Sequence, residues 1–196
     1  MNDEEFNILL DKLINVVTEL HHRWKIYREV YASDPENFDL LNKFGPNFFH
    51  YAQYLMLDHI ALAFSKLTDP NRQGNKENLS LKQVHVYASD RQDNQLVTDL
   101  KVRFELLVDN CQKFRLLRNK RIAHADLEHG LGRAREALPG LSRKYVEDAL
   151  HLLREYINTV QLHYRNSQTL YTEIVVAPGS GGDGVIKALR IAHRNA

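Results

Sequence analysis

Hydrophobic residues recur every three or four positions over four long stretches of this chain. This spacing predicts amphipathic helices over about 3–31, 46–67, 94–119 and 142–164. Ser33-Asp34-Pro35 ends the first stretch, and Gly45-Pro46 opens the second with a proline suited to a first helical turn. The expected apolar faces are Phe6, Leu9, Leu13, Val17, Leu20, Trp24, Tyr27 and Tyr31 in the first helix; Phe48, Tyr51, Leu55, His59 and Leu62 in the second; Leu100, Phe104, Leu107, Cys111 and Phe114 in the third; and Tyr145, Ala149, Leu152, Tyr156 and Val160 in the fourth.

Shorter elements are expected between and after these helices. Residues 68–78 are polar and contain a proline and a glycine, which is typical of a loop. Ser80 is placed to cap a short helix that ends near Tyr87, and Ser142 is placed to cap the fourth long helix. Residues 171–177 are β-prone, a glycine-rich connector follows, and a last short helix is expected over 185–194.

Four amphipathic helices each need a partner for their apolar face, and the weak strand signals cannot build a sheet. The sequence therefore predicts an all-α protein, an antiparallel four-helix bundle with additional short helices. We expect residues 1–170 to form the bundle and 171–196 to form a C-terminal extension. Leu153 and Ile157 lie beside the main face of the fourth helix, and they fit either a dimer seam or a broad core face.

Composition places the chain among ordinary globular proteins. Of its 196 residues, 43% are hydrophobic and 26% are charged, and the formal net charge is only +1. A nucleic-acid interface therefore requires a local basic patch. Five cations supply one within nine residues: Lys113, Arg115, Arg118, Lys120 and Arg121. The alternative is a solvated helix end, because cations are favoured at helix C-termini.

The compartment and the redox state follow from a few features. Cys111 is the only cysteine, which excludes an internal disulfide and suits a reducing compartment; its apolar helical spacing predicts a buried thiol. The acidic N-terminus has no apolar signal core, and no stretch is apolar over about twenty residues. We expect a cytoplasmic protein without a membrane segment.

The third helix ends in the segment whose side chains are best suited to catalysis, which contains Arg118, Asn119 and His124. An arginine holds phosphate oxygens with paired donors and could stabilise the charge of a pentacovalent phosphorus. A histidine titrates near neutrality and can exchange a proton during attack by a 2′-hydroxyl. RNA carries this nucleophile itself, so the chemistry requires no metal or other cofactor. Asn119 could orient either partner or donate to a phosphoryl oxygen.

The two principal side chains converge only if the helix changes between them. Six positions along a continuous α-helix turn through about 600°, which would separate Arg118 from His124. Asn119 is a suitable place for a break, and Asp126 could then hold the imidazole tautomer. Spacing by itself is weak evidence in a chain with ten histidines, and a helix cap with a surface histidine is the alternative.

This segment resembles the Arg-x(4–6)-His motif of the HEPN superfamily, whose compact helical domains include many metal-independent ribonucleases. Asn119 matches the polar residue after the motif arginine. Residues 62–70 and 77–81, together with 118–126, look similar to the abortive-infection U-type subgroup. The resemblance covers about 24–164.

The resemblance implies a HEPN-type bundle that cleaves RNA as a homodimer, with Arg118, Asn119 and His124 as catalytic residues. Lys113, Arg115, Lys120 and Arg121 would contact RNA, and Asp126 would support the site. Such a protein would act in a toxin or phage-defence system and could bind an antitoxin protein. The alternative is a non-catalytic module that binds RNA, a nucleotide or a protein.

A second constellation fits a di-metal site of a four-helix bundle. Glu19 and His22, like Asp148 and His151, have the spacing of such ligands. The remaining helices offer Asp58 and Glu105, but neither lies clearly on an apolar face. We therefore expect no metal site.

Overall fold

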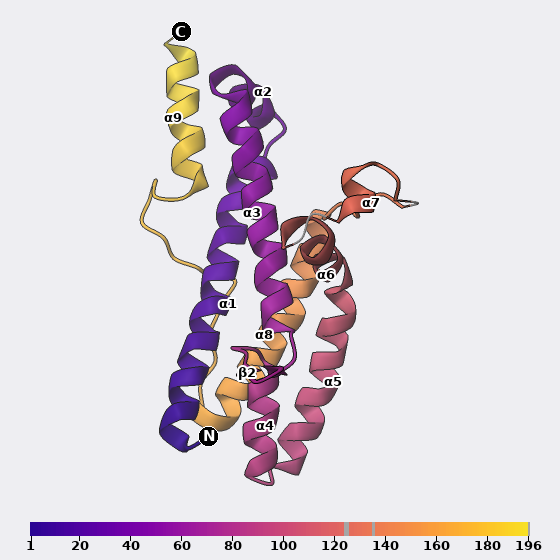
Figure 1. Ribbon diagram of the computed structural model, residues 1–196. Coiled ribbons are helices and arrows are strands. Elements are labelled where there is room, and N and C mark those ends of the chain that lie inside the picture. Colours follow the sequence, from indigo (N-terminus) through magenta and orange to yellow (C-terminus); the bar gives the residue numbers. More distant parts are fainter. Residues whose placement is uncertain (124–125, 135, 196) are drawn as a thin grey trace. The chain divides into compact units, whose positions relative to one another are not determined.

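The computed structural model describes residues 1–123, 126–134 and 136–195, and most of these residues are helical (Figure 1). The all-α class predicted from the sequence is confirmed. The elements are α1 (Asp3–Tyr31), α2 (Glu36–Phe44), α3 (Pro46–Leu67), β1 (Arg72–Gln73), β2 (Lys76–Glu77), α4 (Lys82–Asp90), α5 (Asn94–Asn110), α6 (Gln112–Leu117), the π-helix η1 (Arg118–Ile122), α7 (Leu127–Gly130), α8 (Arg143–Arg165) and α9 (Gly182–Arg194). The two strands form a small antiparallel hairpin in which Arg72 pairs with Glu77.

The chain forms two compact units. The first unit comprises Met1–Thr18 and Ala61–Thr169, and the second comprises Glu19–Ile60 and Leu170–Ala196. α1 and α3 therefore each contribute residues to both units. The C-terminal segment, predicted as an extension of a bundle over 1–170, groups with residues 19–60.

The first unit has its core among α4, α5 and α8. α5 lies against both other helices, and Figure 1 shows α4 and α5 side by side. Tyr156 of α8 is fully buried, and its hydroxyl donates to the Leu81 carbonyl at 2.9 Å. The expected apolar face of the third helix is buried throughout, including Cys111. Leu153 and Ile157 are also fully buried, so they belong to the core and not to a dimer seam.

Of the two serine N-caps predicted in the first unit, one is observed and the other is not. The Ser142 hydroxyl accepts a hydrogen bond from the Tyr145 N–H at 3.2 Å, which confirms its predicted cap of α8. The predicted cap by Ser80 is wrong. Leu81 occupies the N-cap of α4, and the Ser80 hydroxyl is buried without a partner in the described part of the chain.

The second unit is built around the contact of α2 with α9, which lie beside each other in Figure 1. Its apolar cluster contains Val30, Tyr31, Leu40, Leu41 and Ile186, with Tyr27, Phe49, Met56 and Leu189 packed against it. α9 begins three residues earlier than predicted, within the glycine-rich stretch. A Cβ at Gly182 would lie 2.8 Å from the Ile26 carbonyl oxygen, so glycine is required where α9 starts.

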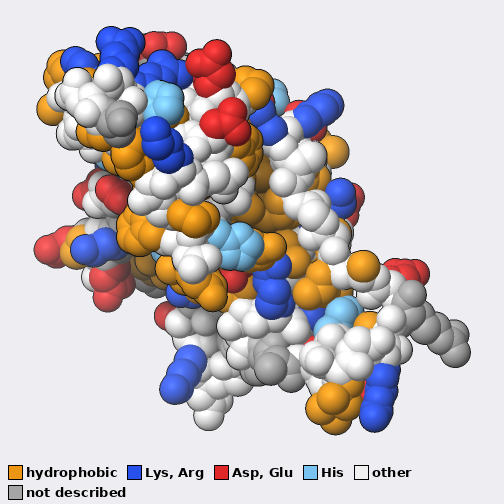
Figure 2. Space-filling model, turned by 90° about the horizontal axis from the view of Figure 1, so that it is seen from above, with side chains coloured by type: hydrophobic (Ala, Val, Ile, Leu, Met, Phe, Trp, Pro, Cys, Tyr) orange, Lys and Arg blue, Asp and Glu red, His pale blue; other side chains and the backbone are white. Residues whose placement is uncertain are grey.

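Two other expectations about apolar residues are wrong. Residues 171–177 form no strand, and Tyr171 is instead buried with its ring stacked on His21. The predicted face of the second long helix is also not a core face: Phe48, Tyr51 and Leu55 are 66–70% exposed. The face of the molecule in Figure 2 shows apolar areas between side chains of both charges. Within the described residues, no helix is both long enough and apolar enough to cross a bilayer.

Candidate functional site

The helix that carries the candidate motif changes its hydrogen bonding at Arg118. α5 and α6 are separated at Cys111, and α6 passes into the π-helix η1 at Arg118. The Ala123 N–H donates to the Arg118 carbonyl at 2.8 Å, a bond over five residues where an α-helix would span four. The helix therefore does not break at Asn119 as expected. It widens from Arg118 to Ile122, and such π-turns are frequent at functional sites.

The Arg118 guanidinium is held by two side chains. Its Nη1 lies 2.8 Å from each carboxylate oxygen of Asp69, and its Nε donates to Oδ1 of Asn119 at 3.0 Å. The Arg118 and Asp69 side chains are 23% and 22% exposed, so the ion pair is partly shielded from solvent. The structure thus brings Arg118 and Asn119 together, and it adds Asp69.

Asp69 follows the end of α3, forty-nine residues before Arg118. The neighbouring Thr68 is buried, and its carbonyl accepts a hydrogen bond from Nη2 of Arg115. Arg115 and Arg118 are three residues apart, so both reach the same exit of α3. Asp69 is not among the residues predicted from the sequence, although it lies in the segment 62–70 that is similar to the U-type subgroup.

Asp126 forms a second charged cluster after the π-helix. Its Oδ2 accepts from Lys120 Nζ at 2.7 Å, and its Oδ1 lies 2.8 Å from His129 Nδ1. Oδ1 also accepts the His129 N–H, which caps α7. These hydrogen bonds, of which that from Lys120 has the largest effect, hold the pKa of the Asp126 carboxyl well below its usual range. Asp126 therefore stays ionised at neutral pH.

The five basic residues predicted to form a patch have different surroundings. Arg115 and Arg118 contact the α3 exit, and Lys120 is paired with Asp126. Lys113 is exposed, and its ammonium lies 4.9 Å from the centre of the Tyr145 ring. Arg121 is exposed as well. The RNA-binding role of these residues stays a prediction.

His124, the predicted proton-transfer residue, lies outside the described residues, as does Ala125. What the structure shows of the motif is the arginine, the asparagine and their support.

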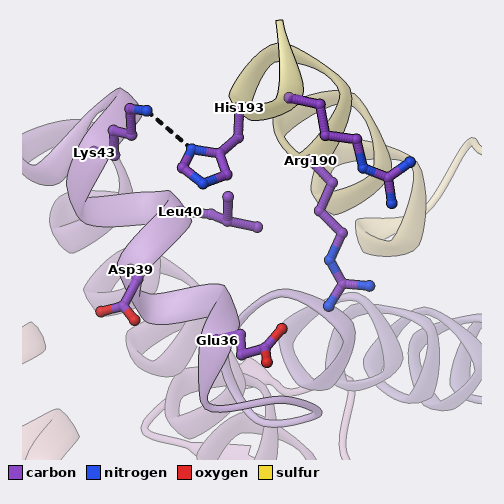
Figure 3. Close-up of a pocket in the computed structure, with 7 residues that line it drawn as sticks. Glu36, Asp39, Leu40, Lys43, Arg190 and His193 are labelled. Atoms are coloured by element: carbon purple, nitrogen blue, oxygen red, sulfur yellow. Dashed lines mark hydrogen bonds between the residues drawn. The ribbon is translucent and has the colours of Figure 1, made fainter. Parts of the chain in front are cut away.

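A cavity of about 600 Å³ lies between α2 and α9 of the second unit (Figure 3). It is lined by Glu36, Asp39, Leu40, Lys43, Arg190, His193 and Arg194. The Lys43 ammonium donates to Nδ1 of His193 at 2.9 Å, the contact dashed in Figure 3. Carboxylates and cations both line this cavity, so its charge selects no ligand class.

Potential metal ligands are dispersed. In the chain without residues 124, 125, 135 and 196, no three His, Cys, Asp or Glu side chains come together in a way that could hold a metal ion. Asp148, from the alternative di-metal set, is paired with Lys144 on the surface of α8.

Comparison with known protein families gives a match over most of the chain. The model of a HEPN family described as AbiU2 matches residues 3–176. Neither a search of curated proteins nor a search of solved structures found a match. The matched range covers most of the chain, including the whole segment around Arg118.

Proposed function

Since the chain belongs to the AbiU2 family of HEPN proteins, which links it to abortive infection, we propose that it is a metal-independent endoribonuclease of a toxin or phage-defence system. The observation that carries the proposal is the fixed guanidinium of Arg118. It lies at the start of a π-turn, is oriented by Asn119, and is still partly exposed. This arrangement suits a cation that must meet a phosphate at the surface.

The proposed reaction is an internal displacement within RNA. His124 removes the proton of a 2′-hydroxyl, and the 2′-oxygen attacks the adjacent phosphorus. The bond from phosphorus to the 5′-oxygen breaks, and that oxygen takes up a proton, which leaves a 2′,3′-cyclic phosphate. Arg118 stabilises the additional negative charge on the phosphoryl oxygens as the transition state forms. The residues assigned to these steps are those that match the family's motif.

RNA would be held by the cations near the motif. Lys113 and Arg121 are exposed and suit contacts with the phosphate backbone. Arg115 is engaged at the Thr68 carbonyl, and Lys120 is paired with Asp126, so both would act by supporting the site. We place the protein in the cytoplasm, where its RNA substrate and an antitoxin protein are available.

We further propose that the protein is a homodimer joined by the exposed apolar face of α3. Phe48, Tyr51 and Leu55 are each 66–70% exposed. Since a large apolar side chain has an area of about 150–250 Å², the three together expose roughly 400 Å². This is about half of what each partner buries in a standard interface. A second copy can cover this face with the same residues in a two-fold arrangement.

The central experiment compares wild type with His124→Ala and Arg118→Ala on RNA in excess chelator. We expect each variant to lose about 10²–10⁴ of the cleavage rate. His151→Ala is the matched control, because His151 is an exposed histidine of α8 and belongs to the di-metal alternative. Equal cleavage by wild type and His124→Ala would refute the catalytic assignment. Loss of activity in His151→Ala and on chelation would favour the metal site.

The second candidate is a non-catalytic module that binds RNA, a nucleotide or a protein. The Arg118–Asp69 ion pair favours it, because a carboxylate already neutralises part of the motif cation. Expression in a bacterial host discriminates the two. A ribonuclease slows growth in a manner that Arg118→Ala abolishes, whereas growth with a binding module is the same with or without this change. Thermal stabilisation by a nucleotide would identify nucleotide binding.

A further inference from the structure

We propose that Asp69 is the positioning residue of Arg118, and that it turns Nη2 of the guanidinium toward the phosphate. The inference rests on the proposed ribonuclease function and assigns a residue outside the motif to it. Asp69 does not touch the reacting atoms in this proposal. It acts only through Arg118.

The geometry of the guanidinium shows which of its nitrogens the described residues hold. Nη1 faces both oxygens of Asp69, and Nε donates to Asn119. Nη2 has no partner among residues 1–123, 126–134 and 136–195. A guanidinium is planar and its donors are fixed relative to one another, so holding two nitrogens fixes the third. A phosphoryl oxygen can therefore be met by Nη2 without reorientation of the side chain.

Asp69 is itself held on a well-connected turn. The Asp69 N–H donates to the Lys66 carbonyl at 3.3 Å, and the Leu81 N–H donates to the Leu67 carbonyl at 2.9 Å. The Asn78 side chain donates to the Pro70 carbonyl at 2.9 Å. The turn is thus bonded on both sides of the carboxylate, which makes it a rigid support. Rigid support of this kind is what a preorganised catalytic group requires.

The ion pair has opposite effects on binding and on the chemical step. The Asp69 carboxylate repels an RNA phosphate and offsets part of the attraction of Arg118, so it weakens binding of the ground state. It also keeps the guanidinium where charge develops in the transition state, which accelerates the chemical step. Removing the carboxylate should therefore slow cleavage and leave RNA affinity equal or stronger. A purely structural role would not separate the two quantities.

The test uses Asp69→Asn and Asp69→Ala, with Asp148→Asn as the matched control. Asp148 also forms an ion pair, with Lys144, but on the exposed surface of α8. Single-turnover cleavage gives the chemical step, and fluorescence anisotropy with 2′-O-methyl RNA, which cannot react, gives the dissociation constant. We expect Asp69→Ala to cleave about 10²-fold more slowly, as a misplaced catalytic group does. Asp69→Asn, which keeps a hydrogen-bond acceptor, should lie between it and wild type, and Asp148→Asn should match wild type.

The outcomes separate this inference from the proposed function. If Arg118→Ala is inactive but both Asp69 variants cleave at the wild-type rate, the ribonuclease stands and the positioning role is overturned. A parallel loss of cleavage, RNA affinity and thermal stability in Asp69→Asn also overturns it. If wild type cleaves no RNA, the positioning role is tested by comparing the Nε–H signal of Arg118 in NMR spectra of wild type and Asp69→Ala. Its broadening or loss in Asp69→Ala supports positioning, and an unchanged signal overturns it.

Discussion

The ring of Phe64 in α3 stacks on the ring of Phe114 in α6, with centroids 4.6 Å apart and planes inclined by only 1°. Both side chains are completely buried. Phe64 lies five residues before Asp69, and Phe114 lies four residues before Arg118. The stacked pair therefore fixes the end of α3 against the helix that presents the motif arginine.

Truncation of this pair should destabilise the protein and disturb the Arg118–Asp69 contact. We expect Phe114→Ala to lower the free energy of unfolding by about 3–5 kcal/mol, because it leaves a cavity in a packed core. Urea denaturation measures the loss. Phe38→Ala is the control, since Phe38 is 46% exposed and its truncation should cost less than about 1 kcal/mol. Equal losses in the two variants would show that the stacked pair has no special part in stability.

Helix limits were predicted best where a long stretch with helical spacing of apolar residues has a proline near one end. The predicted limits of α1 and α3 coincide with those observed; Pro35 lies shortly after the end of α1, and Pro46 is the first residue of α3. α2 was missed: it has only nine residues, and its buried residues Leu40 and Leu41 belong to an apolar cluster that includes Ile186, far along the chain. β-propensity misled at residues 171–177, because a strand depends on a partner that tertiary structure must supply.

The site was predictable in its local part only. Arg118 and Asn119 are adjacent in sequence, so their contact follows from a short motif. Asp69 is forty-nine residues away, and no spacing rule connects it to Arg118. The π-turn was equally hidden, because it is a choice between two hydrogen-bond patterns that the same residues can form. A change in the helix near Asn119 was expected, but it was expected as a break, whereas the helix widens into a π-helix.

His85 predicts a loss of stability in mild acid. Burial, with a smaller contribution from Lys82, lowers the pKa of its imidazole from 6.5 to about 4, and its Nε2 is buried without a partner in the described residues. The unfolded chain therefore binds the proton more readily, so stability is constant above about pH 7 and falls as the pH drops from about 6.5 to 4. Because His85 is partly exposed, we expect a loss of about 2 kcal/mol, less than the whole shift implies.

His85→Phe isolates this contribution from the titration of carboxylates. The His85 ring lies against Phe104 and Tyr156, so a phenyl ring suits its surroundings. Urea denaturation at pH 7 and at pH 4.5 should show a smaller acid-induced loss for the variant than for wild type. The same loss in both proteins would mean that His85 titrates normally in the folded state.

The exposed face of α3 predicts a dimer that a single charge disrupts. Leu55→Arg places a cation in this apolar face, where it would be buried and unpaired in the assembly. We expect wild type to sediment as a dimer at micromolar concentration and Leu55→Arg to sediment as a monomer. Ile8→Arg, which changes an exposed apolar residue of α1, should leave the dimer intact. A monomeric wild type, or a dimer that tolerates Leu55→Arg, contradicts the proposed interface.

Alanine variants of the basic residues near the motif should fall into two groups, which differ in the salt dependence of RNA affinity. Lys113 and Arg121 are exposed, so each alanine variant should weaken RNA binding and reduce the slope of log affinity against log salt by about 0.7. Arg115→Ala should leave this slope almost unchanged. It should instead lower the melting temperature, because Arg115 donates to the carbonyl of Thr68, the residue before Asp69. Anisotropy titrations between 50 and 200 mM salt, a range of about fourfold, measure the slopes. If Arg115→Ala reduced the slope as much as Lys113→Ala, with no loss of thermal stability, Arg115 would have to leave the α3 exit to bind RNA, and the support assigned to it here would be wrong.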